Sequence, residues 1–191
     1  MRTRHLLAML AAAIATGTGH AETSTYQIDP THTFVTFEVV HFGTSTNRGR
    51  FDRKAGSVSL DKAAKVGHAE LTLEAASIDT GTPGFDKHLL GDNFLNAAIF
   101  PAARFISDNF TFNADQVSQV EGQLTLLGKT NPVVLRATKF NCYMNPLLKR
   151  EVCGGDFEAT IQRSQWGMNW GIDLGVPDVV KLVIQVEAIK Q

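Results

Sequence analysis

The sequence predicts an all-β fold of about eight substantial strands, mostly antiparallel, with one helical interruption. Apolar and polar residues alternate with a period of two through most of the chain, and clusters of glycine, asparagine and proline separate the alternating runs. The stretch GFDKHLLGDNFLNAAIFP at residues 84–101 is different, because its apolar residues recur at spacings that suit a short helix and its exit. These observations indicate a chain of strands that stops once to form a helical plug.

The alternating runs give the strands in chain order. The expected strands cover residues 33–39, 68–75, 119–126, 133–137, 157–161 and 180–188, and turns are expected at 47–49, 113–115 and 128–132. Each strand then has one dry face and one wet face, which both a sandwich and a closed barrel satisfy. An eight-stranded barrel is wide enough either to be filled by side chains or to hold one slim ligand. Periodicity alone leaves both architectures open.

The parity of the alternation predicts which side chains face the interior. A slip of one residue would send the whole set into water, so the apolar members of each run define the inward face. The predicted inward residues are Val35, Phe37, Val39, Leu71, Leu73, Leu124, Phe157, Leu182 and Ile184.

Two apolar segments interrupt the strands. In the first, Asp86 is expected to cap a helix that carries Phe85, Leu89 and Phe94, together with His88. The second is the glycine-broken stretch RSQWGMNWG at 163–171, which contains Trp166 and Trp170. Such segments must bury their apolar side, and in a barrel they would cover a mouth with that side toward the lumen. The alternative is that both segments fill the core.

The first residues have the features of a secretory signal peptide. Arg2 and Arg4 precede an apolar run over residues 6–15, and small residues lead to a cleavage site expected after Ala21. The apolar run is too short to span a bilayer of roughly 30 Å. We therefore expect a signal peptide at 1–21 and a single domain at 22–191, located in the periplasm.

The composition argues against several classes of partner. The formal net charge is −1, and loss of the signal peptide would remove two arginines. Nucleic acids and anionic membrane surfaces both require a basic patch, so neither is expected as a partner. No later segment is apolar enough to span a membrane, and we expect no stable membrane insertion.

Cys142 and Cys153 are the two cysteines of the chain. They lie in the stretch FNCYMNPLLKREVCGG, between two segments of strand character, with turn signals between and after them. Two cysteines in an exported protein usually pair, and the spacing excludes a redox C-x-x-C motif. The sequence predicts a disulfide across a long hairpin.

The chain shows no recognisable catalytic set. Nucleophile motifs, phosphate-binding glycine loops and histidine pairs at i, i+4 are absent from the sequence. His32 and His41 bracket one strand nine residues apart and cannot share a metal ion from it. Asp86 and His88 are separated by one residue, and side chains two positions apart on a helix do not face each other. We expect no metal, no cofactor and no enzymatic activity.

Five stretches resemble a known family when taken in order. They are YQIDPTHTFVTFEVVHFG (26–43), ASIDTG (76–81), DKHLLGDNFLNAAIFPAARFIS (86–107), GQLTLLGKTNPVVL (122–135) and RSQWGM (163–168). Together they resemble the successive signatures of the YceI-like family, from about Tyr26 to the C-terminus. The resemblance implies a periplasmic, lipocalin-like antiparallel barrel of eight strands, with a short helical segment across one mouth. It also implies an apolar lumen for an isoprenoid chain, and a possible homodimer. Phe85 stands where many members have arginine, which changes the expected head-group contacts.

The resulting hypothesis is a carrier or storage protein for a long-chain isoprenoid lipid, such as a quinone (ubiquinone) or a polyprenyl phosphate. The expected ligand-binding residues are the inward set together with the mouth residues Phe85, His88, Leu89, Phe94, Trp166 and Trp170. Two alternatives stay open. One is an enzyme that acts on a lipid with Asp86 and His88, and the other is a filled barrel that serves as a stress or interaction module.

Overall fold

The computed structural model describes residues 23–191, so the predicted signal peptide and its cleavage after Ala21 lie outside these residues. Residues 23–191 form eleven strands, one α-helix and two short 3-10 turns. The strands are β1 (Ser24–Ile28), β2 (Phe34–His41), β3 (Ser45–Phe51), β4 (Lys54–Asp61), β5 (Val66–Glu74), β6 (Ile78–Asp79), β7 (Ala102–Asn113), β8 (Gln116–Leu126), β9 (Lys129–Met144), β10 (Glu151–Gln162) and β11 (Val179–Lys190). The helix α1 is Pro83–Leu90, and the turns are η1 (Ala75–Ser77) and η2 (Arg163–Trp166).

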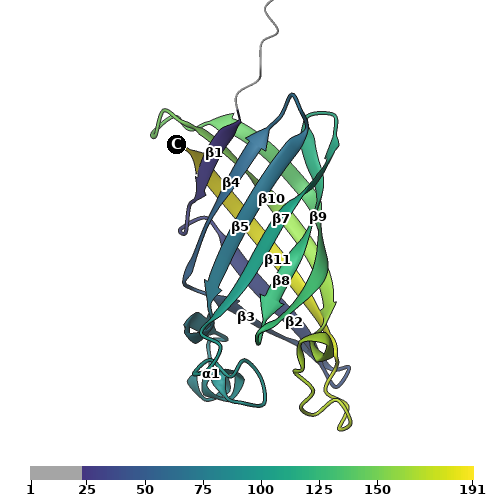
Figure 1. The fold of residues 1–191 in the computed structure, drawn as a ribbon. Helices are drawn as coiled ribbons and strands as arrows, with labels where there is room; N and C mark the ends of the chain where they lie inside the picture. Colours follow the sequence, from purple (N-terminus) through teal and green to yellow (C-terminus); the bar gives the residue numbers. More distant parts are fainter. Residues whose placement is uncertain (1–22) are drawn as a thin grey trace, which may run out of the picture.

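Eight strands close into an antiparallel barrel. Their order around the wall is β1-β4-β5-β7-β8-β9-β10-β11, and β1 pairs back onto β11 to complete the ring (Figure 1). β2 pairs with β11 further along that strand, β3 pairs with β2, and the short β6 pairs with β3. Closure confirms the barrel and excludes the sandwich. Within residues 23–191, no helix has the length and apolar character that crossing a bilayer requires.

Several strands extend beyond the alternating runs that predicted them. The β5 strand runs over Val66–Glu74 and β11 over Val179–Lys190, close to the runs expected from the pattern. Buried apolar side chains from all around the wall form one cluster inside the barrel. A second, smaller cluster of Ile78, Leu89, Phe94 and Leu95 lies at the end of the barrel that carries α1.

The turn expected at 47–49 is wrong. These residues lie inside β3, and the chain reverses at Phe42 and Gly43, both of which have positive φ. Gly49 pairs with Phe37 on β2, and a Cβ at Gly49 would lie 2.5 Å from Cζ of the Phe37 ring. Glycine is therefore required here to make room for a cross-strand phenylalanine, and it does not mark a turn. The turn expected at 113–115 does join β7 and β8.

The capping role expected for Asp86 is also wrong. The N-cap of α1 is Thr82, with Pro83 at the first helical position, where its missing N–H has no cost. Asp86 lies one turn into the helix, and its Oδ1 accepts hydrogen bonds from the backbone N–H (2.8 Å) and hydroxyl (2.6 Å) of Thr80. Asp86 thus fastens the helix to the residue that follows β6.

The segment between β10 and β11 is held by a buried arginine. Arg163 is 3% exposed, and its guanidinium donates hydrogen bonds to the carbonyls of Met168 (2.6 Å), Pro177 (2.9 Å) and Val176 (3.2 Å). Burial lowers the pKa of Arg163, and the nearby Asp178 opposes that shift. The Asp178 carboxylate itself accepts from the N–H and hydroxyl of Ser164. One side chain therefore organises a segment that contains no regular structure beyond η2.

Candidate functional site

The interior of the barrel is an apolar lumen and is not filled by side chains. A cavity of about 550 Å³ runs inside the wall and is lined by residues of all eight strands of the ring. Its size lies within the range of about 300–1,000 Å³ that small-molecule sites occupy. The presence of this space argues against the filled-barrel alternative.

Fourteen of the fifteen predicted ligand-binding residues line this cavity. They are Val35, Phe37, Val39, Leu71, Leu73, Phe85, His88, Leu89, Phe94, Leu124, Phe157, Trp170, Leu182 and Ile184. The inward parity is seen directly in the pairing, where Val35 opposes Ile184 and Phe37 opposes Leu182. Their location is thus as expected, and their contact with a ligand stays a prediction.

Trp166 does not line the cavity. It is 1% exposed, and its indole N–H donates a hydrogen bond of 3.0 Å to the carbonyl of Leu124 on β8. A buried tryptophan needs a partner for this N–H, and the bond fixes η2 against the barrel wall. Trp166 therefore holds η2 against β8 without lining the cavity, while Trp170 of the same segment lines it.

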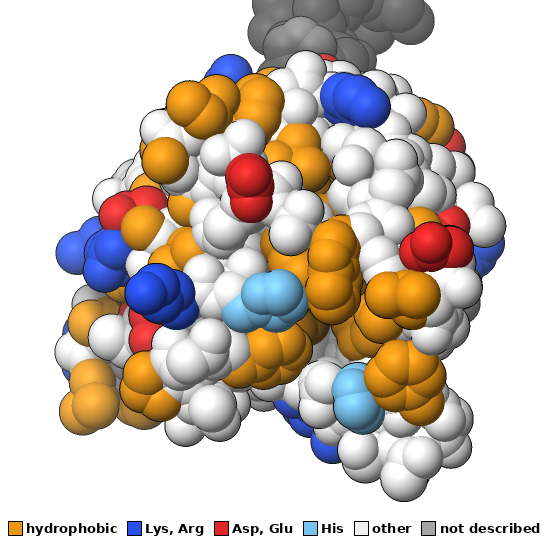
Figure 2. Space-filling model, turned by 90° about the horizontal axis from the view of Figure 1, so that it is seen from below, with side chains coloured by type: hydrophobic (Ala, Val, Ile, Leu, Met, Phe, Trp, Pro, Cys, Tyr) orange, Lys and Arg blue, Asp and Glu red, His pale blue; other side chains and the backbone are white. Residues whose placement is uncertain are grey.

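The two apolar segments meet at one mouth of the barrel. The His88 ring of α1 lies edge-on to Phe94 (4.9 Å between centroids) and to Trp170 (5.2 Å), and Phe94 lies 5.4 Å from Trp170. Seen from this end, hydrophobic side chains gather in and around a recess, with histidine side chains beside them (Figure 2). The predicted cover of one mouth is thus present, and it consists of packed rings.

The rim of this mouth exposes further apolar side chains. Phe42 in the β2–β3 turn is 55% exposed, Leu174 is 68% exposed and Ile99 is 66% exposed. A Cβ at Gly175 would lie 3.3 Å from the Phe42 ring, so the β2–β3 turn also touches the segment after η2. Exposed apolar side chains that adjoin a cavity are typical of a site for an apolar partner.

Phenylalanine rings lie along the wall and leave the lumen open. A Cβ at Gly49 would meet the Phe37 ring, and a Cβ at Gly122 would lie 2.4 Å from the Phe105 ring. Each ring thus occupies the space above a glycine on the neighbouring strand. Bulky residues can then line the wall without crossing the centre of the barrel.

Several lining residues were not predicted from the sequence. They include Tyr26, Ile28, Val58, Leu60, Phe105, Phe110, Val120, Val133, Leu135, Phe140, Val180 and Val186. Alternation in residues 54–61 would have placed Val58 and Leu60. In β7 a register shift between Ile106 and Asn109 lets both Phe105 and Phe110 face inward, although their numbers differ in parity. Such a bulge is visible only once the strands are paired.

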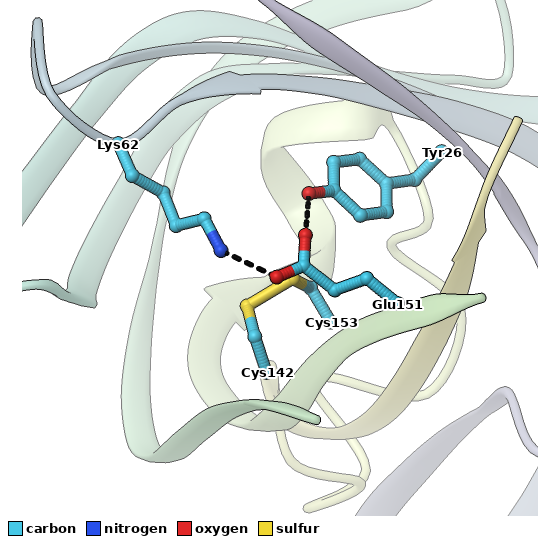
Figure 3. The surroundings of a disulfide bond; sticks show 5 residues. All are labelled: Tyr26, Lys62, Cys142, Glu151 and Cys153. Carbon is cyan, nitrogen blue, oxygen red and sulfur yellow. Dashed lines mark hydrogen bonds and ion pairs between the residues drawn. A yellow bond between two sulfur atoms is a disulfide. The ribbon is translucent and has the colours of Figure 1, made fainter. Parts of the chain in front are cut away.

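The end of the barrel away from α1 carries the disulfide and a polar group. Cys142 on β9 and Cys153 on β10 are directly paired and joined by a disulfide, which confirms the prediction. Beside it, the Tyr26 hydroxyl donates to Glu151 Oε1 (2.5 Å), and Lys62 Nζ donates to Glu151 Oε2 (2.8 Å) (Figure 3). Burial and the hydrogen bond to Glu151 raise the pKa of Tyr26 to about 12. The bonds from Lys62 and Tyr26 lower the pKa of Glu151.

Two possible chemical sites, a metal site and an Asp86–His88 acid–base pair, do not form among residues 23–191. Among residues 23–191, the three potential metal ligands that lie within 4.8 Å of one another are Cys142, Glu151 and Cys153, but both sulfurs are committed to the disulfide. Asp86 is bonded to Thr80 and His88 packs against rings, so the two residues do not form an acid–base pair.

Comparison with known proteins supplies the family. A family model described as a YceI-like domain matches residues 26–188. The chain is 35% identical over 196 residues to a UPF0312 protein of Shewanella denitrificans, covering 98% of this chain and 99% of that protein. It is 33% identical over 192 residues to Protein YceI of Salmonella arizonae, covering 98% of both chains. The chain belongs to the YceI-like family.

Solved structures share the fold of this chain. BcnA of Burkholderia cenocepacia superimposes with a TM-score of 0.70 at 22% identity, covering 84% of this chain and 98% of that one. A polyisoprenoid-binding domain from Saccharophagus degradans superimposes with a TM-score of 0.59 at 15% identity, covering 87% of this chain and 98% of that domain. At these identities the likeness concerns the barrel itself.

Proposed function

We propose that this YceI-like protein holds one molecule of a long-chain isoprenoid lipid, of the quinone or polyprenyl type, in its barrel lumen. The observation that carries the proposal is the apolar cavity of about 550 Å³ that extends from the mouth under α1 to Tyr26. The structural neighbour that is a polyisoprenoid-binding domain supports the same class of ligand. No cofactor and no chemical step are part of this function.

The isoprenoid tail supplies most of the binding free energy. Burial of apolar surface contributes about 25 cal/mol per Å² before the costs of association. The lining at the mouth includes the polar residues His41, Asn47 and His88. In this proposal they orient the head group. Since Phe85 replaces the arginine expected from the resemblance, the head group meets fewer charges, and the tail dominates recognition.

The proposed site of action is the periplasm. The disulfide between Cys142 and Cys153 suits an oxidising compartment, and the predicted signal peptide would direct export. There the protein would carry or store a lipid that water does not dissolve. The resemblance further leads us to expect a homodimer, which sedimentation of the purified protein would test.

The test is to identify what the protein holds when it comes from its own source. Protein purified from its native periplasm is extracted with organic solvent, and the extract is analysed by mass spectrometry. We expect one class of isoprenoid lipid at close to one molecule per chain, as a single slim lumen requires. Protein that carries no apolar molecule, and that does not take up a long-chain quinone or polyprenol after delipidation, would contradict the proposal.

A further inference from the structure

We propose that Tyr26, held by Glu151 and Lys62, is the end wall of the lumen and sets the longest isoprenoid chain that the barrel accepts. This inference rests on the proposed function and adds to it a specificity for chain length. Three features of the structure carry it: a polar bridge across one end of the barrel, the burial of the tyrosine beneath this bridge, and the disulfide beside it.

The bridge crosses the end of the barrel and does not run along its wall. Glu151 is the first residue of β10, and Lys62 follows the last residue of β4. In the ring, β11 and β1 stand between β10 and β4, so the Lys62–Glu151 ion pair of 2.8 Å spans two intervening strands. The side chains of Lys62, Glu151 and Tyr26 point toward one another across this end (Figure 3).

Tyr26 is the part of this bridge that meets the lumen. It lines the cavity, it is only 1% exposed, and it belongs to the same buried cluster as Leu60, Val117 and Ala188. Its ring faces the apolar space, and its hydroxyl bonds to Glu151 at 2.5 Å. A chain that advanced past the ring would separate this bond and leave a partly buried carboxylate with one partner fewer, which is unfavourable.

The disulfide keeps the same end from widening. Cys153 lines the cavity, and its bond to Cys142 joins β9 to β10 at the residue pair next to Glu151 along the inner face. The two strands therefore cannot separate to admit a longer chain while the bond is intact. At the other end, the mouth is covered by contacts between the His88, Phe94 and Trp170 rings, which can part without loss of an ion pair. The isoprenoid chain accordingly enters beneath α1, and its last isoprene unit stops at Tyr26.

The experiment measures the length of the bound chain directly. Delipidated wild-type protein is incubated with an equimolar mixture of all-trans polyprenols that differ by one isoprene unit, and native mass spectrometry identifies the lengths retained. The same measurement is made on Tyr26→Ala, Tyr26→Leu, Tyr26→Phe and Tyr26→Trp. Tyr143→Ala is the matched control, because Tyr143 is the other tyrosine, lies on β9 next to Cys142, is 42% exposed and is not part of the cavity lining.

The expected result is a shift of the upper length limit that follows the size of residue 26. The limit should rise by roughly one isoprene unit in Tyr26→Ala, since removing the ring opens a comparable volume. Tyr26→Leu, which keeps the site apolar and partly filled, should shift the limit in the same direction if the alanine variant does not fold. The limit should fall in Tyr26→Trp and stay in place in Tyr143→Ala. Tyr26→Phe keeps the ring but loses its bond to Glu151, so the limit should rise by less than in Tyr26→Ala.

Two results would overturn the inference in distinguishable ways. If the wild type retains polyprenols but all variants show the same upper limit, Tyr26 is not the end wall, while the proposed function stands. Equal weakening of every chain length in Tyr26→Ala has the same meaning, because it would place the head group at this end. If the wild type retains no polyprenol of any length and takes up no long-chain quinone either, the proposed function fails and the inference fails with it.

Discussion

At the scale of single residues, Tyr26 shows how one side chain responds to the two environments that it joins. Its ring belongs to the apolar lumen, and its hydroxyl belongs to the polar group with Glu151 and Lys62. Burial, followed by the hydrogen bond to Glu151, raises its pKa from 10.0 to about 12. Between about pH 10 and pH 12 the Tyr26 hydroxyl therefore stays protonated in the folded protein, whereas it is deprotonated in the unfolded chain.

This difference predicts a loss of stability in alkaline solution. Between about pH 10 and pH 12 the unfolded chain binds fewer protons at Tyr26 than the folded protein does, so the free energy of unfolding falls as the pH rises. The slope from this one group is about 1.4 kcal/mol per pH unit. Tyr26→Phe has no proton to lose, and its denaturant-derived stability should fall less steeply than that of the wild type. Parallel curves for the two proteins over this range would contradict the prediction.

Gly49 shows a different constraint at the residue scale, namely space for a ring on the next strand. Gly49→Ala would place a Cβ 2.5 Å from the Phe37 ring and 2.9 Å from a methyl group of Thr80. The ring must then move toward the lumen, and such overpacking typically costs about 1–3 kcal/mol. We expect a lower melting temperature together with lower uptake of a long-chain polyprenol. Gly84→Ala is the control, because nothing lies within 4 Å of a Cβ at that position.

At the scale of elements, the β9–β10 hairpin and the mouth segments close the two ends of the barrel by different means. The hairpin is fixed covalently by Cys142–Cys153. The mouth segments depend on the carbonyl contacts of Arg163, the Thr80 contacts of Asp86 and the edge-on contact of the His88 and Trp170 rings. The difference suits a lumen with one fixed end and one end that can open.

Removal of the disulfide should weaken the hairpin without unfolding the barrel. Closing a loop with a separation of 11 residues contributes on the order of 2–3 kcal/mol. The double variant Cys142→Ala, Cys153→Ala should lose about this much free energy of unfolding, and hydrogen exchange should increase in β9 and β10 more than in β5 and β7. The wild type under reducing conditions is the control. Global loss of strand content in the variant would show that the disulfide supports the whole barrel.

At the scale of the whole molecule, the lumen decides whether added bulk displaces ligand or strains the core. Leu71 lines the cavity from β5, and its neighbour Thr72 is exposed on the outer face. Leu71→Trp should reduce uptake of long-chain polyprenols several-fold while the melting temperature of the delipidated protein changes little, because the indole occupies ligand space. Thr72→Trp adds the same bulk outside and should leave uptake unchanged.

The opposite pattern would contradict the carrier function. If Leu71→Trp lowers the melting temperature of the delipidated protein by an amount that corresponds to about 1–3 kcal/mol, the core is overpacked and no free space exists for a ligand. His88→Ala provides a second comparison, since a lipid held mainly by its tail should be affected less by this change than by Leu71→Trp. Abolished binding in His88→Ala with normal binding in Leu71→Trp would indicate a head-group site in place of a tail site.

The sequence by itself determined the strand class, the inward face and the disulfide. These properties are local, because the period of two assigns a face to each residue without knowledge of its partners. Val35, Phe37, Leu71 and Ile184 could therefore be placed inside before any strand was paired. The predicted export and the cysteine spacing were likewise enough to predict the bond between Cys142 and Cys153.

Only the tertiary structure decided the features that depend on strands far apart in the chain. The sequence pattern predicts a turn at Gly49, whereas the structure shows that the glycine makes room for the Phe37 ring. The bulge in β7 changes the parity of the residues that face inward. The sequence pattern predicts that Trp166 lines the lumen, but in the structure its N–H donates to the carbonyl of Leu124. Tyr26 donates to Glu151, which lies 125 residues away in the sequence. These contacts form because the strands pair into a closed ring. A pattern that repeats every two residues carries no information about which strands pair with each other.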